Sequence, residues 1–161
     1  MDSIPMTRVG KKQLEDELTH LIRVEREGIK KALAEARALG DLRENAEYHS
    51  AKEKQSLIEG RIQELQYKIS RAEVVDVTAL KGTQVRFGAT VTLYDCQKEK
   101  SITYQIVGAD EADIKLNKIA FNGPLGKNLI GKDEGDTVQV DAPKGKLEYE
   151  IQKVEYISWP A

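Results

Sequence analysis

The first half of the chain carries apolar residues at helical spacing. Between Gly10 and Gly40 they recur every three, four or seven positions, with charges of both signs between them. This spacing predicts one long amphipathic helix. A second series from about Glu44 to Ala72 keeps the same rhythm, with no proline and only Gly60 as an internal breaker, and predicts a partner helix. The two apolar series are Leu14, Leu18, Leu21, Ile22, Ile29, Leu33 and Ala36, then Ala51, Ile58, Ile62, Leu65, Ile69 and Ala72.

The short separation of these two helices predicts an antiparallel hairpin. About five residues lie between them, which leaves room only for a tight reversal that lets the two apolar stripes cover each other. At a rise of about 1.5 Å per residue, about 30 residues give a helical arm about 45 Å long. We therefore assign residues 1–76 to a coiled-coil hairpin whose tip is residues 40–45.

After residue 76 the pattern changes to short runs rich in β-branched and aromatic residues, separated by turn residues. These runs predict an antiparallel sheet. Residues 123–132 begin with Gly-Pro and end with Gly-Lys, which predicts a short covering helix. The fold class is thus α+β, with a sheet domain at residues 77–158 and a tail at residues 159–161. The predicted strands are residues 84–87, 89–94, 101–107, 137–140 and 147–157.

Composition narrows the function classes. The chain has 161 residues with 32% charged and 40% hydrophobic, a net charge of −2, and 6% aromatic residues. The low aromatic content disfavours a deep small-molecule pocket and base-stacking platforms. A near-neutral charge disfavours general coating of nucleic acid, so any such contact is local. No apolar stretch approaches a membrane span or a signal peptide core.

The lone Cys96 and the widely separated His20 and His49 exclude an internal disulfide and a Cys/His zinc site within one chain. Cysteine usage of this kind is typical of a reducing compartment, and we expect the protein in the cytoplasm.

The predicted tip carries two acids, Asp41 and Glu44, three residues apart. This spacing has two interpretations. Asp-x-x-Glu is a variant of the capping box, in which both side chains satisfy free amides at a helix start. A close carboxylate pair also attracts a divalent cation, above all Mg²⁺, whose remaining ligands a partner can supply. The residues alone leave both interpretations open.

Basic and apolar residues surround these acids. Arg37, Arg43 and Lys52 fall within a few turns of the tip and are either solubilising charges or contacts for nucleic-acid phosphate. Leu42 is a hydrophobic staple or a contact for a partner. Tyr48 is expected to pack across the hairpin, and His49 receives no catalytic role.

An ordered series of short strings resembles the Gre family of bacterial transcript cleavage factors, and the resemblance covers essentially the whole chain. The equal numbers of basic and acidic residues in the first half favour the GreA type of this family. The longest string is Gly-Asp-Leu-Arg-Glu-Asn-Ala-Glu-Tyr-His at the tip. The strings lie at residues 4–7, 40–49, 59–62, 87–91, 106–108, 110–113 and 129–132.

The resemblance implies a hairpin followed by an FKBP-like domain. In the family that domain docks at the rim of the RNA polymerase secondary channel, for which Pro124, Leu125 and Ile130 are the candidates here. The hairpin enters the channel, and the tip acids, here Asp41 and Glu44, help hold the second Mg²⁺ of the polymerase active centre. The factor is then not an enzyme itself, since the polymerase cleaves its own backtracked RNA.

The resemblance also implies roles around the tip. Arg37, Arg43 and Lys52 become the patch that contacts the RNA 3′ end, while Leu42, Asn45 and Tyr48 support the tip. Lys52 stands where the family often has arginine, which keeps the charge and loses the bidentate fork. Gly123 stands where serine often precedes Pro124. A monomer is expected, because the arm has to enter a narrow channel.

Two other functions remain to be weighed. The protein can occupy the channel and inhibit the polymerase without cleavage, as relatives with altered tips do. The FKBP-like domain can also be a prolyl isomerase, but such a site needs an aromatic hollow. The second half offers only Phe87, Phe121 and Trp159 as phenylalanine or tryptophan.

Overall fold

The computed structural model describes residues 2–157 and divides into two compact units. One unit contains Asp2 and Lys11–Ala72, and the other contains Ser3–Gly10 and the chain from Glu73 onward. The predicted tail at residues 159–161, and with it Trp159, lies outside the described residues.

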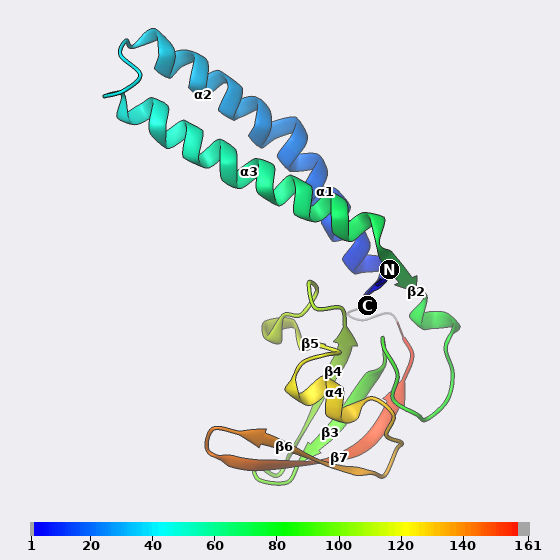
Figure 1. Cartoon of the computed structure of the whole chain (residues 1–161). Helices are drawn as coiled ribbons and strands as arrows, with labels where there is room; N and C mark the ends of the chain where they lie inside the picture. Colours follow the sequence, from blue (N-terminus) through cyan, green and yellow to red (C-terminus); the bar gives the residue numbers. More distant parts are fainter. Residues whose placement is uncertain (1, 158–161) are drawn as a thin grey trace. The chain divides into compact units, whose positions relative to one another are not determined.

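The first unit is a helical hairpin (Figure 1). The first predicted helix is α1 (Arg8–His20), a π-helical turn η1 (Leu21–Glu25) and α2 (Arg26–Ala38), which follow one another without a break in helical backbone. The second is α3 (Ala46–Ser70), which lies antiparallel to α2. The spacing did not predict the π-helical turn.

The predicted apolar stripes meet between the helices. Buried side chains of α2 and α3 form the centre of this core, with half-buried residues of α1, η1 and α3 around it. Leu65, a member of the predicted apolar series of α3, is also fully buried. The central residues are Ile29, Leu33, Ile58 and Ile62.

Two bidentate ion pairs join the helices of this hairpin. Arg26 of α2 donates from Nε and Nη2 to the carboxylate of Glu59 at 2.9 and 2.8 Å. Arg61 of α3 donates in the same way to Glu17 of α1 at 2.7 and 2.9 Å. The hydrogen bond from Arg61 lowers the pKa of Glu17, and that from Arg26 lowers the pKa of Glu59. Paired arginine forks of this kind fix the register of the helices.

Replacement of Glu17 by glutamine is expected to lower the free energy of unfolding by about 0.5–1 kcal/mol at pH 7, the range for half-exposed ion pairs. Because folding lowers the pKa of Glu17, its stabilisation is present above the unfolded pKa and disappears as pH falls through the folded pKa. Urea unfolding at pH 7 and near pH 2 measures the difference. Glu53→Gln, at an exposed position of α3, is the control. An equal loss at both pH values would contradict the ion-pair explanation.

The second unit is built on a five-stranded sheet of order β5-β4-β3-β7-β6 (Figure 1). All neighbouring pairs are antiparallel except β4 with β5, which is parallel. The α+β fold is therefore confirmed. The strands are β3 (Thr90–Asp95), β4 (Lys100–Val107), β5 (Lys118–Ala120), β6 (Thr137–Ala142) and β7 (Gly145–Glu155).

A short helix, α4 (Pro124–Leu129), contacts β5 and β6. Leu129 is fully buried in the core that the helix closes. The core of this unit takes side chains from β3, β4, β6, β7 and the segment before β3. Its buried members are Val85, Ala89, Val91, Leu93, Ile106, Leu129, Val138, Ile151 and Val154.

The structure corrects three details of this half. Residues 84–87 are not a strand: Val85 exchanges backbone hydrogen bonds with Lys132 and Gly131 in the loop after α4, and only Gln84 forms an isolated bridge. The predicted helix at residues 123–132 is limited to α4. The strand β5 was missed and makes the sheet mixed, because three residues are too short to show a period of two.

Two further strands lie near the ends of the hairpin sequence. β1 (Ile4–Thr7) and β2 (Ala72–Val75) form a separate two-stranded sheet that the helical pattern did not predict. Two short helical turns, η2 (Val77–Ala79) and η3 (Ile114–Leu116), complete the elements. No helix among the described residues is both long enough and apolar enough to span a membrane.

A buried carboxylate fixes the N-terminal strand to the sheet unit. Glu111 is 8% exposed and accepts the N–H of Thr7 at 2.9 Å, the N–H of Gly108 at 3.1 Å, and the hydroxyl of Thr7. The same Thr7 hydroxyl accepts the N–H of Gly10 at 3.1 Å. A Cβ at Gly10 would lie 2.0 Å from Cδ of Glu111, so glycine is required there by close approach. Glu111 thus ties the segment at Thr7 to the turn at Gly108.

Candidate functional site at the hairpin loop

The loop between α2 and α3 is held by one asparagine. Gly40 follows the end of α2 with φ +118°, a conformation that favours glycine. Asn45 is the N-cap of α3 and accepts the N–H of Tyr48 at 3.0 Å. Its amide also donates to the carbonyl of Ala36 at 2.6 Å. Asn45 therefore fastens the start of α3 to the end of α2.

Asp41 lies inside the loop and does not cap α3. Its Oδ1 accepts the N–H of Arg43 at 2.9 Å, which forms a local turn. Because Asn45 occupies the N-cap position, the capping box between Asp41 and Glu44 is not formed. One carboxylate oxygen of Asp41 is used by the loop, and Glu44 is exposed. The local structure leaves both acids with oxygens that face solvent or a partner.

The two acids line one open hollow of about 390 Å³ at the loop, together with Glu47 from the first turn of α3. Sequence reasoning did not single out Glu47, although it follows Glu44 by three residues, the spacing that places side chains on one helix face. Oxygen ligands of this kind suit Mg²⁺. Within residues 2–157, no group of three or more His, Cys, Asp or Glu side chains is close enough to hold a metal ion. The three acids that line the hollow do not form a complete metal site by themselves.

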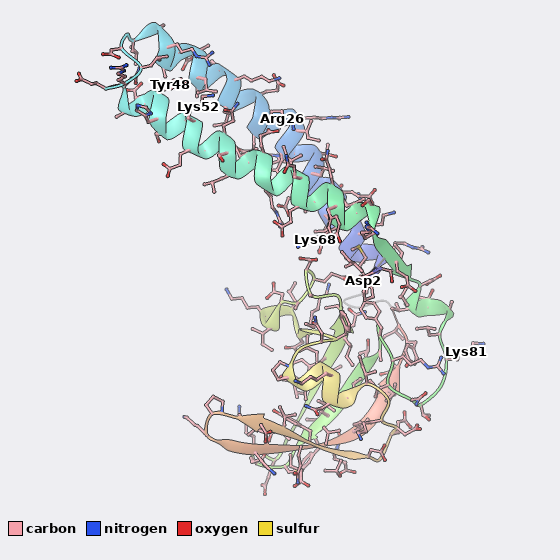
Figure 2. The ribbon with its side chains drawn as sticks, viewed as in Figure 1. Asp2, Arg26, Tyr48, Lys52, Lys68 and Lys81 are labelled. Carbon is pink, nitrogen blue, oxygen red and sulfur yellow. The ribbon has the colours of Figure 1, made fainter. Side chains whose placement is uncertain are left out.

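The predicted basic residues differ in how they are held. The guanidinium of Arg37 lies over the ring of Tyr48, 5.9 Å from its centroid, at the upper limit of a cation–π contact. Tyr48 is half-buried and packs against the hairpin core. Lys52 is exposed, with Nζ 3.5 Å from Oε1 of Gln55. Figure 2 shows Tyr48 and Lys52 at the loop end of α3.

Arg43 and Leu42 lie in the loop itself. Arg43 is held through its backbone, by Asp41 at its N–H and by the ring of His49 at its carbonyl. Leu42 is 40% exposed and is not part of the hairpin core. It is also three positions before the N-cap, so it is not the staple residue that directly precedes a cap. An apolar side chain exposed beside the acids is available to a partner.

The three predicted docking residues lie around α4. Pro124 is its first residue, Leu125 is half-buried against the sheet core, and Ile130 follows the helix with 36% exposure. Pro124 and Leu125 line a hollow of about 280 Å³ beside β5, which Ile130 does not reach. Gly123 caps α4 without a side-chain hydrogen bond.

The two phenylalanines weighed for an isomerase site lie together in the sheet unit. Phe87 and Phe121 pack against each other edge to face, with ring centroids 5.6 Å apart. Neither of them lines the hollow beside α4. The arrangement gives no support to a prolyl isomerase site.

Comparison with known proteins covers both units. Residues 4–74 match the family model described as "Transcription elongation factor, N-terminal", and residues 80–156 match "Transcription elongation factor, GreA/GreB, C-term". The chain is 56% identical over 155 residues to transcription elongation factor GreA of Xylella fastidiosa (strain 9a5c), covering 96% of this chain and 98% of the relative. It is also 56% identical over 156 residues to GreA of Hyphomonas neptunium, covering 97% and 99%.

Among solved structures, the chain is similar to GreA factor homolog 1 of Thermus thermophilus. The two are 27% identical, with a TM-score of 0.43 and coverage of 95% of this chain and 99% of the other.

Proposed function

The chain belongs to the GreA/GreB family of bacterial transcription elongation factors, and on this premise we propose that it stimulates the cleavage of backtracked RNA by RNA polymerase. In this proposal the hairpin loop enters the secondary channel of the polymerase. The polymerase releases short 3′ fragments of the nascent RNA, so that an arrested complex resumes elongation. The protein acts as an accessory factor, and the polymerase remains the nuclease.

The observation that carries the proposal is the exposed pair Asp41 and Glu44 on one hollow at the loop. Mg²⁺ bound there and to the polymerase would orient and activate the attacking water. Asp41 and Glu44 supply hard oxygen ligands, and Asn45 fixes the loop that carries them. Because the hollow is open, we assign the remaining ligands to the polymerase and the RNA phosphate.

We propose that Arg37, Arg43 and Lys52 contact phosphates near the RNA 3′ end. The contact over Tyr48 pre-orients Arg37, while Lys52 is exposed as a point charge. With a net charge of −2 on the whole chain, this contact is local and sensitive to salt. Tyr48 and Asn45 support the loop, and Leu42 offers an apolar contact within the channel.

We propose that the surface of α4 docks on the polymerase rim. Pro124, Leu125 and Ile130 provide an apolar surface at the two ends of this helix, and Ile130 is 36% exposed. The protein is expected to act as a monomer in the cytoplasm, where its polymerase is found.

The test is a cleavage assay on a stalled, backtracked elongation complex that carries 3′-labelled RNA and Mg²⁺. We expect the protein to release short labelled fragments and to restore elongation. If the RNA keeps its length while nucleotide addition slows, the protein is instead a channel-occupying inhibitor. In a parallel binding measurement Ile130→Glu should weaken the polymerase complex, whereas Lys98→Glu on the turn after β3 should not.

A further inference from the structure

We propose that His49 is a positioning residue for the acids of the loop, and that it acts through the backbone of Arg43. The inference deepens the proposed function and rests on it. His49 does not line the hollow that contains Asp41 and Glu44, so its effect on a cation there is indirect.

The imidazole of His49 makes a defined contact with the loop. Its Nε2 lies 3.0 Å from the carbonyl oxygen of Arg43. A carbonyl oxygen only accepts, so the ring must carry its proton on Nε2 and donate it. The neighbouring ring of Tyr48 meets His49 nearly edge-on, with centroids 5.6 Å apart and planes at 71°. Helix α3 and this aromatic neighbour together restrict the orientation of the imidazole.

The bond from His49 completes a chain of contacts through the loop. Arg43 is held at its carbonyl by His49 and at its N–H by Oδ1 of Asp41, at 2.9 Å. The Arg43 carbonyl belongs to the peptide group that joins Arg43 to Glu44, so the bond from His49 restrains the backbone at Glu44. Because one end of this chain is the carboxylate of Asp41 and the other end is next to Glu44, it fixes both acids relative to α3.

Asn45 and His49 hold different parts of the same loop. Asn45 links the start of α3 to Ala36 at the end of α2. Its side-chain oxygen accepts the N–H of Tyr48 in the first turn of α3, whereas His49 reaches the segment between Asp41 and Glu44 at the carbonyl of Arg43. Loss of His49 is therefore expected to leave the hairpin folded and to loosen only the segment that carries the acids.

The test compares His49→Leu, which removes the donor, with His49→Gln, whose amide nitrogen can donate to the same carbonyl. In the cleavage assay, His49→Leu should raise the Mg²⁺ concentration for half-maximal cleavage about five- to tenfold, the range for one lost hydrogen bond. His49→Gln should stay within about twofold of the original protein. Polymerase affinity and melting temperature should be unchanged. His20→Leu, which changes the other histidine, is the matched control and should have no effect.

The outcomes distinguish the positioning role of His49 from the proposed cleavage function. If the unaltered protein stimulates cleavage and His49→Leu needs no more Mg²⁺, the positioning role is wrong while the proposed function stands. If the unaltered protein does not stimulate cleavage, the proposed function is wrong. Nitrogen-15 spectra of the imidazole test the geometry independently of activity, since a proton found only on Nδ1 overturns the inference. Amide exchange at Arg43, whose N–H donates to Asp41, should accelerate in His49→Leu and not in His49→Gln.

Discussion

Replacement of Asp41 or Glu44 by alanine is expected to reduce stimulated RNA cleavage by about 100-fold or more, because either change removes a carboxylate ligand from the Mg²⁺ site that we propose at the loop. Cleavage rates of a backtracked complex, measured at saturating protein, give this effect directly. The melting temperature and the affinity for polymerase should change little. Neither acid is buried, and neither one caps α3.

Two conservative variants separate metal binding from loop structure. Asp41→Asn keeps an oxygen that accepts the N–H of Arg43 and removes the charge. If the carboxylate acts on a cation, this variant is as inactive as Asp41→Ala, even though the loop bond is retained. Glu44→Gln should behave in the same way. Glu47→Gln serves as a comparison within the same hollow. It should have a smaller effect, because Glu47 lies in the first turn of α3, where its negative charge also stabilises the start of the helix.

The opposite result has a clear structural meaning. If Asp41→Asn keeps full activity while Asp41→Ala loses it, the residue matters only as an acceptor for the backbone of Arg43. If both variants lower the melting temperature and leave the activity of each folded molecule unchanged, the acids stabilise the turn and do not take part in cleavage.

The sequence pattern predicts the hairpin well because its stripes repeat over many turns. Ile29, Leu33, Ile58 and Ile62 are buried together as their spacing requires. The register between the helices depends in addition on the Arg26 to Glu59 pair and its counterpart, which join residues far apart in sequence. Spacing within one helix contains no signal for such pairs.

The structure of the candidate site was predictable only in part. Gly40 and Asn45 have the residue types that end and begin helices, so the loop could be placed from local rules. The choice of Asn45 over Asp41 as the cap could not be made from spacing, since both types are good caps. The contact of His49 depends on the path of the loop back towards α3, which no local pattern encodes.

The buried carboxylate of Glu111 was invisible for the same reason. Its partner Thr7 precedes it by about a hundred residues, and the string around it has the composition of an ordinary polar turn. The short strands β1 and β5 were missed because they contain only four and three residues. Such elements exist because of long-range pairing, and their own residues have little preference for it.

Replacement of Glu111 by alanine is expected to lower the free energy of unfolding by about 2–4 kcal/mol, because buried donors on Thr7 and Gly108 lose their acceptor together. Urea unfolding followed by near-ultraviolet circular dichroism measures this loss. Glu111→Gln keeps one acceptor oxygen and should lose about half as much. Glu150→Ala, at an exposed position of β7, controls for removal of a carboxylate alone.

A double-mutant cycle tests whether the loss comes from the Thr7 contact. Thr7→Val removes the hydroxyl that donates to Glu111 and that also accepts the N–H of Gly10. Residues that share one hydrogen-bond network give non-additive losses, so the double variant with Glu111→Gln should lose less than the two single changes combined. Additive losses, or a loss for Glu111→Ala no larger than for Glu150→Ala, would mean that the carboxylate does not hold β1. Non-additive losses would show that the strand at the start of the chain depends on a side chain of the sheet unit for its place.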